Sequence, residues 1–586
     1  MSTIARHRQP GHAGWIIAGV ASLALVLGGT AVAYVFYADR GCGEPVTATI
    51  ATSSDQFPVL SRLATQWTAG NPTVDGRCAR VEVRAVASHA VAAALGPNWD
   101  EQRDGARPDV WAPESTAWLL VAASRPDASS LLPTGTPPAL AFSPVVLAMQ
   151  RPMAKALGWP AREIGWADLL GGFARGQTWA RFGHPEWGEL RLALTDPTRS
   201  VAGLAGVLSA LDLDNDNTMS DQELLGGVVF SQFVTELADN TEVLLRRYAD
   251  VGATSRAAQL PAGFPVVERD LALHSAGGSA VPLVPVYLRD VSSVADYPYV
   301  VLRAPWVDQL RHRVATEFLA YLQGTAGRTA YGEAGFRDTE YAARNTTLLS
   351  LEHGFKPRTG PPTRVPTAQS LGQLLGVWAV LLRPNNVLLA LDTSGSMNDL
   401  VGGTTTTRLQ LLQRAAIEGI SLLTNQTTVG LWEFSSKLTP TTDFRELVPV
   451  GRAGDTVAGV KRRTAMVAAV QGLRATGGTG LYDTIYAAYL AMQRSWIPGA
   501  SNALVIITDG RNEDDVGMDL AQLTAALKQA VRADRPLPIV AIAVGPAADA
   551  QALNQISTAT GGRTFTARDE RTAIQQIVLA FAGRIS

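Results

Sequence analysis

Oxygen-bearing side chains occur at three places in the last third of the chain. In the segment LLALDTSGSMND, apolar residues lead directly into Asp392, and Ser394 and Ser396 follow at steps of two. Thr479 lies in GGTGLYD, and Asp509 ends a second apolar run, ALVIITD. Carboxylates and hydroxyls are the hard oxygen ligands that Mg²⁺ prefers. We therefore predict that these five residues form one cation site.

Four apolar runs in the same region predict the buried strands that position this site. They alternate with helical segments, which is typical of an α/β fold with a doubly wound parallel sheet. The predicted strands are 385–392, 428–434, 503–509 and 538–545. Ligands of open parallel sheets bind beyond the carboxyl ends of the strands, so both aspartates are expected at the same edge.

The motifs DTSGSM, GGTGLYD and IITDGRN, in this order, resemble the three loops of a von Willebrand factor type A (VWA) domain with its metal ion-dependent adhesion site, or MIDAS. The resemblance covers 385–586 and implies a Rossmann-like fold. It also implies that the three hydroxyl residues coordinate Mg²⁺ (or Mn²⁺) directly or nearly so, whereas the two aspartates hold it partly through water. Mostly neutral ligands leave the metal charge under-compensated, so a carboxylate of a protein partner becomes a strong further ligand.

Hydrolysis at this metal is a weaker hypothesis. It requires a positioned base, usually His or Glu, and the last histidine of the chain is His353. Glu513, Asp514 and Asp515 follow Asp509, in a pattern typical of a solvated acidic loop. A single DTSGSM loop also fits a strand-end turn with a helix cap. Three such loops in order favour a metal site over a plain turn. Because no positioned base is identified, we predict a binding protein that is not an enzyme.

Residues 44–355 alternate short β-rich runs with helical patterns. Their motifs ARPDVWAPESTAWL, AFSPVVLAM, LALTDPTRSVAG and DYPYVVL resemble bacterial extracellular solute-binding proteins of the periplasmic type. The resemblance implies two lobes and a ligand cleft lined by strand ends and helix N-termini. Ser143, Thr198 and Ser200 are candidates to bind an anionic solute there, although Thr198 and Ser200 also fit plain helix N-caps. Prolines between 356 and 384 predict a linker to the C-terminal domain.

The stretch DLDNDNTMSDQE has the spacing of an EF-hand calcium loop. Oxygen ligands stand at its positions 1, 3, 5, 9 and 12. These residues are Asp212, Asp214, Asp216, Ser220 and Glu223. Asn217 replaces the usual glycine at position 6, and Asn tolerates the left-handed backbone that this position needs. An acidic surface turn explains the same residues, so Ca²⁺ binding and a plain turn both remain open.

Residues 14–38 carry no charge and are long enough to cross a bilayer. Arg6 and Arg8 precede them, so the positive-inside rule predicts a cytoplasmic N-terminus at 1–13 and an extracytoplasmic body. A cleaved signal peptide is the alternative, since AVA at 31–33 fits a cleavage site. In an oxidising compartment, Cys42 and Cys78, the only cysteines, are expected to form a disulfide.

The sequence therefore predicts a single-pass protein of the cell membrane that binds partners outside the cytoplasm. The formal net charge of −2 shows no electrostatic footprint for nucleic acid. The leading hypothesis is adhesion through the VWA site, with a solute-binding-like module of unknown ligand. The alternatives are the solute-capture component of a transport system and a non-catalytic subunit of a larger enzyme complex.

Overall fold

The computed structural model describes residues 43–96, 99–175, 177–211, 220–250, 258–363, 366–381, 385–401, 404–421, 423, 427–545 and 548–567. The predicted span at 14–38 and Cys42 lie outside these residues. No helix among the described residues is long and apolar enough to cross a membrane. Cys78 is disulfide-bonded, and its predicted pairing with Cys42 stays a prediction.

The described chain divides into two compact units. The first unit contains the residues up to Ala141 together with Asp296–Ala334, and the second contains Phe142–Ala295 and the residues from Gly335 onward. The first unit has a five-stranded sheet in the order β11-β4-β1-β3-β2. Its strands are β1 (Gly43–Thr52), β2 (Thr73–Val74), β3 (Arg77–Ala85), β4 (Val110–Ala112) and β11 (Val300–Val301). Its helices are α2 (Phe57–Ala69), α3 (Ser88–Ala94), α4 (Glu101–Asp104), α5 (Thr116–Ala123), α6 (Pro126–Ser129), α14 (Gln309–Gln323) and α15 (Thr325–Glu333).

The second unit begins with a six-stranded sheet in the order β10-β5-β8-β6-β7, with β9 paired to β5. Its strands are β5 (Ser143–Gln150), β6 (Leu192–Thr195), β7 (Val234–Ala238), β8 (Gly263–Val267), β9 (Leu283–Val286) and β10 (Ser293–Ala295). Its helices are α7 (Arg151–Ala156), α8 (Trp166–Leu170), α9 (Val201–Leu211), α10 (Asp221–Phe233), α11 (Thr241–Asp250) and α13 (Glu268–Ala276). Strand β6 pairs in parallel with β7 and β8, whereas β5 pairs antiparallel with β8, β9 and β10. Helices alternate with these strands, which confirms the predicted α/β content.

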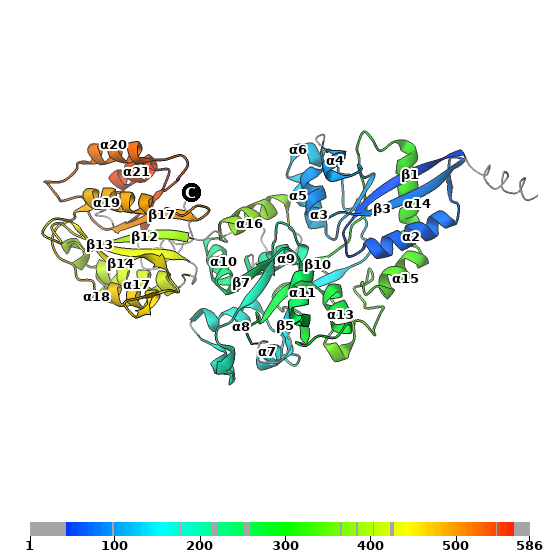
Figure 1. The fold of residues 1–586 in the computed structure, drawn as a ribbon, viewed down its shortest axis with the longest axis horizontal. Coiled ribbons are helices and arrows are strands. Elements are labelled where there is room, and N and C mark those ends of the chain that lie inside the picture. Colours follow the sequence, from blue (N-terminus) through cyan, green and yellow to red (C-terminus); the bar gives the residue numbers. More distant parts are fainter. Residues whose placement is uncertain are drawn as a thin grey trace, which may run out of the picture. The chain divides into compact units, whose positions relative to one another are not determined.

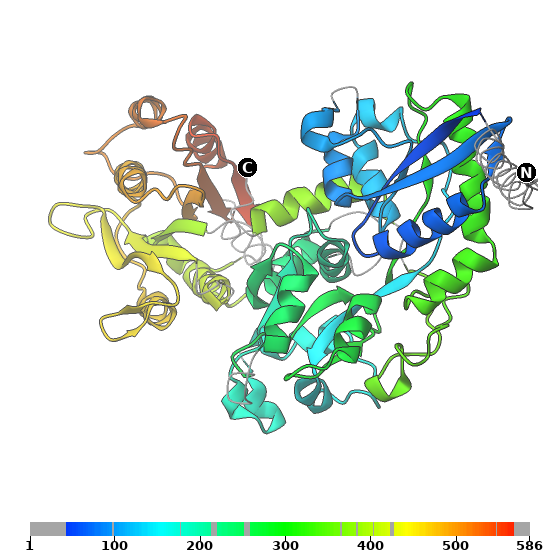
Figure 2. The same cartoon turned by 45° about the vertical axis from the view of Figure 1, so that its right-hand side comes forward.

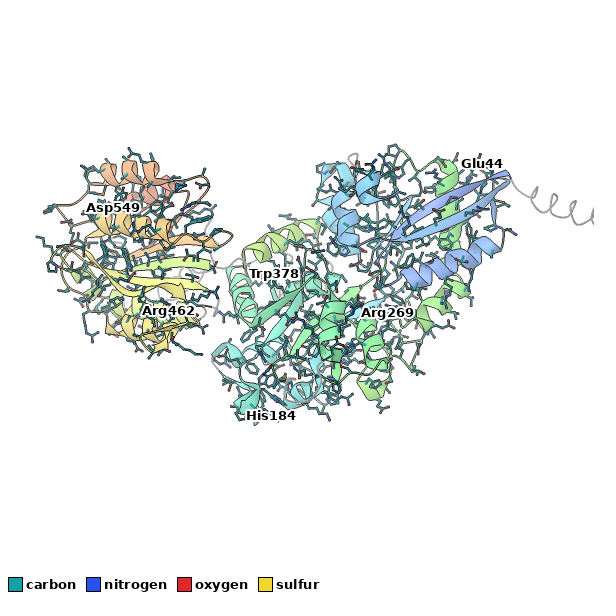
Figure 3. The ribbon with its side chains drawn as sticks, viewed as in Figure 1. Glu44, His184, Arg269, Trp378, Arg462 and Asp549 are labelled. Carbon is teal, nitrogen blue, oxygen red and sulfur yellow. The ribbon has the colours of Figure 1, made fainter. Side chains whose placement is uncertain are left out.

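The predicted linker at 356–384 contains a packed helix, α16 (Ala368–Leu381). Leu371, Leu374 and Trp378 are buried, and α16 packs against α9 and α10. The ring of Trp378, labelled in Figure 3, lies 6.0 Å from that of Phe230 on α10. The proline-rich part fits a connector, whereas 368–381 belongs to the core of the second unit. The linker prediction was too long because it ignored the apolar face of this helix.

The C-terminal region forms a second six-stranded sheet, in the order β14-β13-β12-β17-β18-β19. The strands are β12 (Asn385–Asp392), β13 (Thr428–Phe434), β14 (Phe444–Arg452), β17 (Ser501–Thr508), β18 (Ile539–Val544) and β19 (Thr564–Ala567), beside a small hairpin of β15 (Thr456–Val457) and β16 (Val460–Lys461). All pairings in the sheet are parallel except β13 with β14. The four predicted strands are confirmed, and the two outer strands, β14 and β19, were missed.

Helices cover both faces of this sheet (Figures 1 and 2). One face packs against α17 (Arg408–Ser421) and α18 (Arg462–Gly472), and the other against α19 (Leu481–Arg494), α20 (Leu520–Ala530) and α21 (Ala550–Ala559). Alternate residues of β12 serve the two faces, since Leu389 joins the first core and Leu388 the second. Figure 3 labels Arg462 and Asp549, which mark the starts of α18 and α21 on these opposite faces. This double burial explains the continuous apolar runs and fixes the strand ends.

Candidate metal site and strand-edge residues

Asp392 ends the central strand β12 and is fully buried. Its Oδ1 accepts a hydrogen bond from the Ser394 backbone N–H at 2.7 Å, and its Oδ2 accepts one from the Thr508 hydroxyl at 2.5 Å. Burial raises the pKa of Asp392 to about 6, and the nearby Asp509 carboxylate adds to the rise, whereas the bonds from Ser394 and Thr508 lower it. The local structure therefore orients a carboxylate whose charge is costly without a cation.

A row of oxygen atoms extends from Asp392 along the loop. The hydroxyls of Ser394 and Ser396 lie 3.1 Å apart, and the Ser396 hydroxyl donates to Asp509 Oδ1 at 2.8 Å. Thr479, which is buried before α19, reaches the same place. A Cβ placed on Gly510 would lie 2.9 Å from Thr479 Oγ1 and 3.6 Å from Ser396 Oγ. The structure thus brings all five predicted residues to one edge of the sheet.

The spacing of these donors fits a small divalent cation. Mg²⁺ binds oxygen octahedrally at about 2.0–2.1 Å, so adjacent ligands of one ion stand about 2.9 Å apart. The separations of 3.1 Å between the two serine hydroxyls and 2.8 Å from Ser396 to Asp509 bracket this value. Glycine at 510 keeps a side chain out of the space next to Thr479 and Ser396. Ser394, Ser396 and Thr479 would hold such an ion directly, with Asp392 and Asp509 beside them, and this assignment stays a prediction.

Two residues that the sequence analysis missed contact the predicted aspartates. Thr508 binds Asp392, as described above. Arg408, the first residue of α17, lies with Nη1 2.6 Å from Asp509 Oδ2. An arginine opening the helix after the DTSGSM loop was a possible signal, but nothing local in the sequence indicated which carboxylate it contacts.

A second group of carboxylates lies in neighbouring loops. One oxygen each from Asp443, Asp483 and Asp514 lies within 4.8 Å of the others. The pKa of Asp443 is raised, first by burial and then by the charges of Asp514 and Asp483. Glu513 accepts a 3.3 Å hydrogen bond from the Thr479 backbone N–H. One residue of the predicted solvated acidic loop at 513–515 therefore contacts the loop that carries Thr479. Sequence analysis missed this convergence because the three aspartates come from separate loops.

The candidates predicted for the solute cleft make local hydrogen bonds. The buried Ser143 hydroxyl accepts from the Arg269 backbone N–H at 3.2 Å. The Thr198 hydroxyl and backbone N–H both donate to Asp196 Oδ1, at 2.7 and 2.9 Å, which forms an Asx turn. Ser200 accepts from the Gly203 backbone N–H at 3.4 Å, as an N-cap of α9 does. The N-cap interpretation of Ser200 therefore holds, and solute binding by these residues stays a prediction.

The first unit has its own polar strand edge, which the sequence analysis did not identify. Glu114 follows β4, and its carboxylate accepts from the Trp118 indole N–H at 2.7 Å and from the Ser88 hydroxyl. Asp55 follows β1 and accepts from the Tyr297 hydroxyl at 2.5 Å. Burial, and next the charge of Asp55, raise the pKa of Glu114 to about 7. The signal in the sequence was a carboxylate directly after a buried strand.

The predicted calcium loop is described only at its end. Asp212, Asp214 and Asp216 lie outside the described residues. Ser220 and Glu223 form a capping box at the start of α10, in which the Glu223 carboxylate accepts from the Ser220 backbone N–H at 2.9 Å. Glu223 thus has a structural role that the spacing alone did not reveal, and its role as a calcium ligand stays a prediction.

Two family models match successive regions of the chain, and each region contains one of the polar strand edges described above. Residues 48–337 match the model of bacterial extracellular solute-binding proteins, and residues 386–579 match that of the von Willebrand factor type A domain. The chain joins a solute-binding domain to a VWA domain. VWA domains commonly bind a divalent metal ion at the MIDAS, and the two domains together support an extracellular binding or adhesion role.

Similar proteins match either most of the chain or one of its parts. An uncharacterized protein of Mycobacterium tuberculosis is 25% identical over 89% of this chain and 74% of its own length. A von Willebrand factor type A structure from Catenulispora acidiphila is 21% identical, covering 34% of this chain and 43% of that one, with a TM-score of 0.28. A periplasmic thiamin binding protein is 13% identical, covering 57% of this chain and 97% of that one, with a TM-score of 0.37.

Proposed function

We propose that this protein is an extracytoplasmic binding protein, anchored by residues 14–38, whose VWA domain captures a carboxylate of a protein partner through Mg²⁺. The observation that carries the proposal is the row of hydroxyl and carboxylate oxygens from Ser394 to Asp509, spaced as ligands of one small cation. The solute-binding domain adds a second recognition module. A small solute or a protein partner is the expected ligand class, and catalysis has no part in this function.

The bound ion would act as a Lewis acid that accepts one more oxygen ligand. Two features of the chain would favour binding of that further ligand: the neutral oxygens around the ion and the fixed orientation of Asp392. Ser394, Ser396 and Thr479 supply neutral oxygens, so the atoms in direct contact with the ion carry little of the negative charge that would offset it. The Thr508 hydroxyl and the Ser394 backbone N–H fix the orientation of the Asp392 carboxylate. Such supporting hydrogen bonds typically change metal affinity about 10- to 100-fold when removed.

Two substitutions test the proposal. Asp392→Ala removes a charged oxygen ligand, so Mn²⁺ binding by calorimetry and Mg²⁺-dependent capture of partners from native membranes should disappear together. Thr479→Ala leaves both carboxylates, so it should weaken capture while measurable metal binding remains. Thr524→Ala, on α20, is the matched control and should leave both unchanged. Capture that is indifferent to EDTA and to both site substitutions would show that these oxygens serve only the local turn.

A further inference from the structure

We infer that Arg408 is a built-in counter-charge of the VWA metal site, which weakens metal binding and strengthens the binding of a carboxylate to the loaded site. The inference rests on the proposed function and names the residue that sets the charge of that site. It assigns to Arg408 a positioning and specificity role, distinct from the five residues that offer oxygen to the ion.

The contacts divide the two oxygens of Asp509 between two partners. Oδ1 accepts from the Ser396 hydroxyl at 2.8 Å, on the side of the metal ligands, and Oδ2 lies 2.6 Å from Arg408 Nη1. The side chain of Arg408 is only 11% exposed and that of Asp509 is fully buried. Water therefore screens this pair less than it screens a surface ion pair. Arg408 holds Asp509 in place and partly neutralises its charge.

The position of Arg408 is not explained by the needs of its helix. A cation at a helix N-terminus opposes the macrodipole. Helix α17 already has a reciprocal cap, because the Gln410 backbone N–H donates to Thr407 Oγ1 at 3.1 Å and the Thr407 backbone N–H donates to Gln410 Oε1 at 3.0 Å. The first turn is thus satisfied without Arg408. The ion pair with Asp509 is what compensates a nearly buried guanidinium at this unfavourable end.

A count of formal charges shows the consequence. Asp392 and Asp509 would balance a divalent ion, and the three hydroxyl ligands are neutral. Arg408 adds one positive charge, so the loaded site carries a net charge that a single incoming carboxylate neutralises. Asp399, whose Oδ2 lies 3.5 Å from Arg408 Nη1, is 64% exposed, and Glu513 is also exposed. Solvent screens both of these charges more strongly than the buried pair.

The test compares the full chain with Arg408→Gln, which removes the charge, and Arg408→Lys, which keeps it. Calorimetry measures Mn²⁺ affinity, and water-proton relaxation of the Mn²⁺-loaded protein measures acetate affinity. Removal of a cation near the ion should tighten Mn²⁺ binding and weaken acetate binding, each by about tenfold. Arg408→Lys should stay close to wild type. Arg414→Gln, an exposed arginine on the same helix, is the control and should change neither affinity.

Unchanged or weaker Mn²⁺ binding in a folded Arg408→Gln variant would overturn the inference and leave the proposed function standing if acetate still binds. A wild-type loaded site that does not bind acetate would overturn both. If Arg408→Gln does not fold, Asp399→Asn replaces it. Loss of that exposed carboxylate leaves Arg408 paired with Asp509 alone, so Mn²⁺ binding should weaken by about twofold. Tighter or unchanged Mn²⁺ binding in Asp399→Asn would contradict the role of Arg408.

Discussion

The carboxyl group of Glu114 should make the stability of the solute-binding domain depend on pH near neutrality. In the folded domain, burial and the charge of Asp55 raise its pKa from the ordinary 4.5 to about 7. The folded state therefore binds the proton more tightly than the unfolded chain does. The stabilisation by this proton is complete below about pH 4.5 and is lost as the pH rises through about 7.

The size of the effect follows from the two pKa values. At 1.36 kcal/mol for each pH unit, the difference between 4.5 and about 7 corresponds to at most about 3 kcal/mol. Glu114 is partly accessible to solvent, which reduces this figure. Glu114→Gln resembles the protonated carboxyl group and cannot lose a proton. The variant should therefore keep at pH 8 the stability that wild type has only at lower pH.

The assay is thermal unfolding of both full-length proteins between pH 5 and pH 8. The transition of the solute-binding domain in wild type should fall relative to the variant by about 5 °C across this range. Other titrating groups cancel in the difference between the two proteins. Glu101→Gln, at an exposed position on α4, should show no such difference. A wild-type and a Glu114→Gln transition that stay parallel from pH 5 to pH 8 would refute the argument.

Two other predictions concern the same domain. Arg337 and Glu268 form a fully buried ion pair with an Nε–Oε2 distance of 2.7 Å; Arg337→Met should destabilise by about 3–5 kcal/mol in denaturant unfolding, and adding Glu268→Gln should recover much of the loss. A destabilisation in the double variant as large as in Arg337→Met would contradict this account. Calcium at about 5 mM should raise the melting temperature of wild type, and Glu223→Gln should remove most of that rise while keeping the helix cap; wild type without any calcium-dependent shift would favour the acidic turn.

Local patterns predicted the strands and loops of the VWA domain, because each central strand is buried on both faces and reads as a continuous apolar run. Strand β14 escaped because it is an edge strand whose residues are mostly exposed or half-buried. Strand β19 is only four residues long. The error at α16 has a related cause, since prolines upstream suggested a connector although Trp378 and its neighbours are core residues. Strands buried on both faces were therefore predictable from the sequence, whereas an edge strand, a very short strand and a helix that follows prolines were not.

The sequence predicted only those site residues that belong to recognisable loop motifs at the strand ends. Asp392, Ser394 and Ser396 are neighbours in sequence, and parallel pairing brings Asp509 to the same edge. Contacts between residues far apart in the sequence could not be predicted from the residues next to each of them. Thr508 is 116 residues from Asp392, and Arg408 is 101 residues from Asp509. Such partners depend on which strands lie side by side and on the direction of each side chain, and no periodicity in the sequence encodes either.

A buried carboxylate at a strand edge needs a cation or a proton to offset its charge. Asp509 has Arg408, whereas Asp392 receives hydrogen bonds from neutral donors, Ser394 and Thr508. Without metal, burial keeps the pKa of Asp392 near 6, so at pH 8 the ionised group destabilises the fold. Asp392→Asn removes this charge, and its amide retains an oxygen for the Ser394 N–H and a donor for the Thr508 oxygen.

In EDTA at pH 8, Asp392→Asn should therefore melt at a higher temperature than wild type, by the several degrees that at most about 3 kcal/mol provides. Mg²⁺ should raise the melting temperature of wild type and leave the variant unchanged, because stabilisation by a ligand requires binding. The order of stabilities should then reverse as Mg²⁺ is added. A variant less stable than wild type in EDTA would show that the Asp392 charge is already compensated in the metal-free fold. The metal would then not be needed to offset the cost of burying this carboxylate.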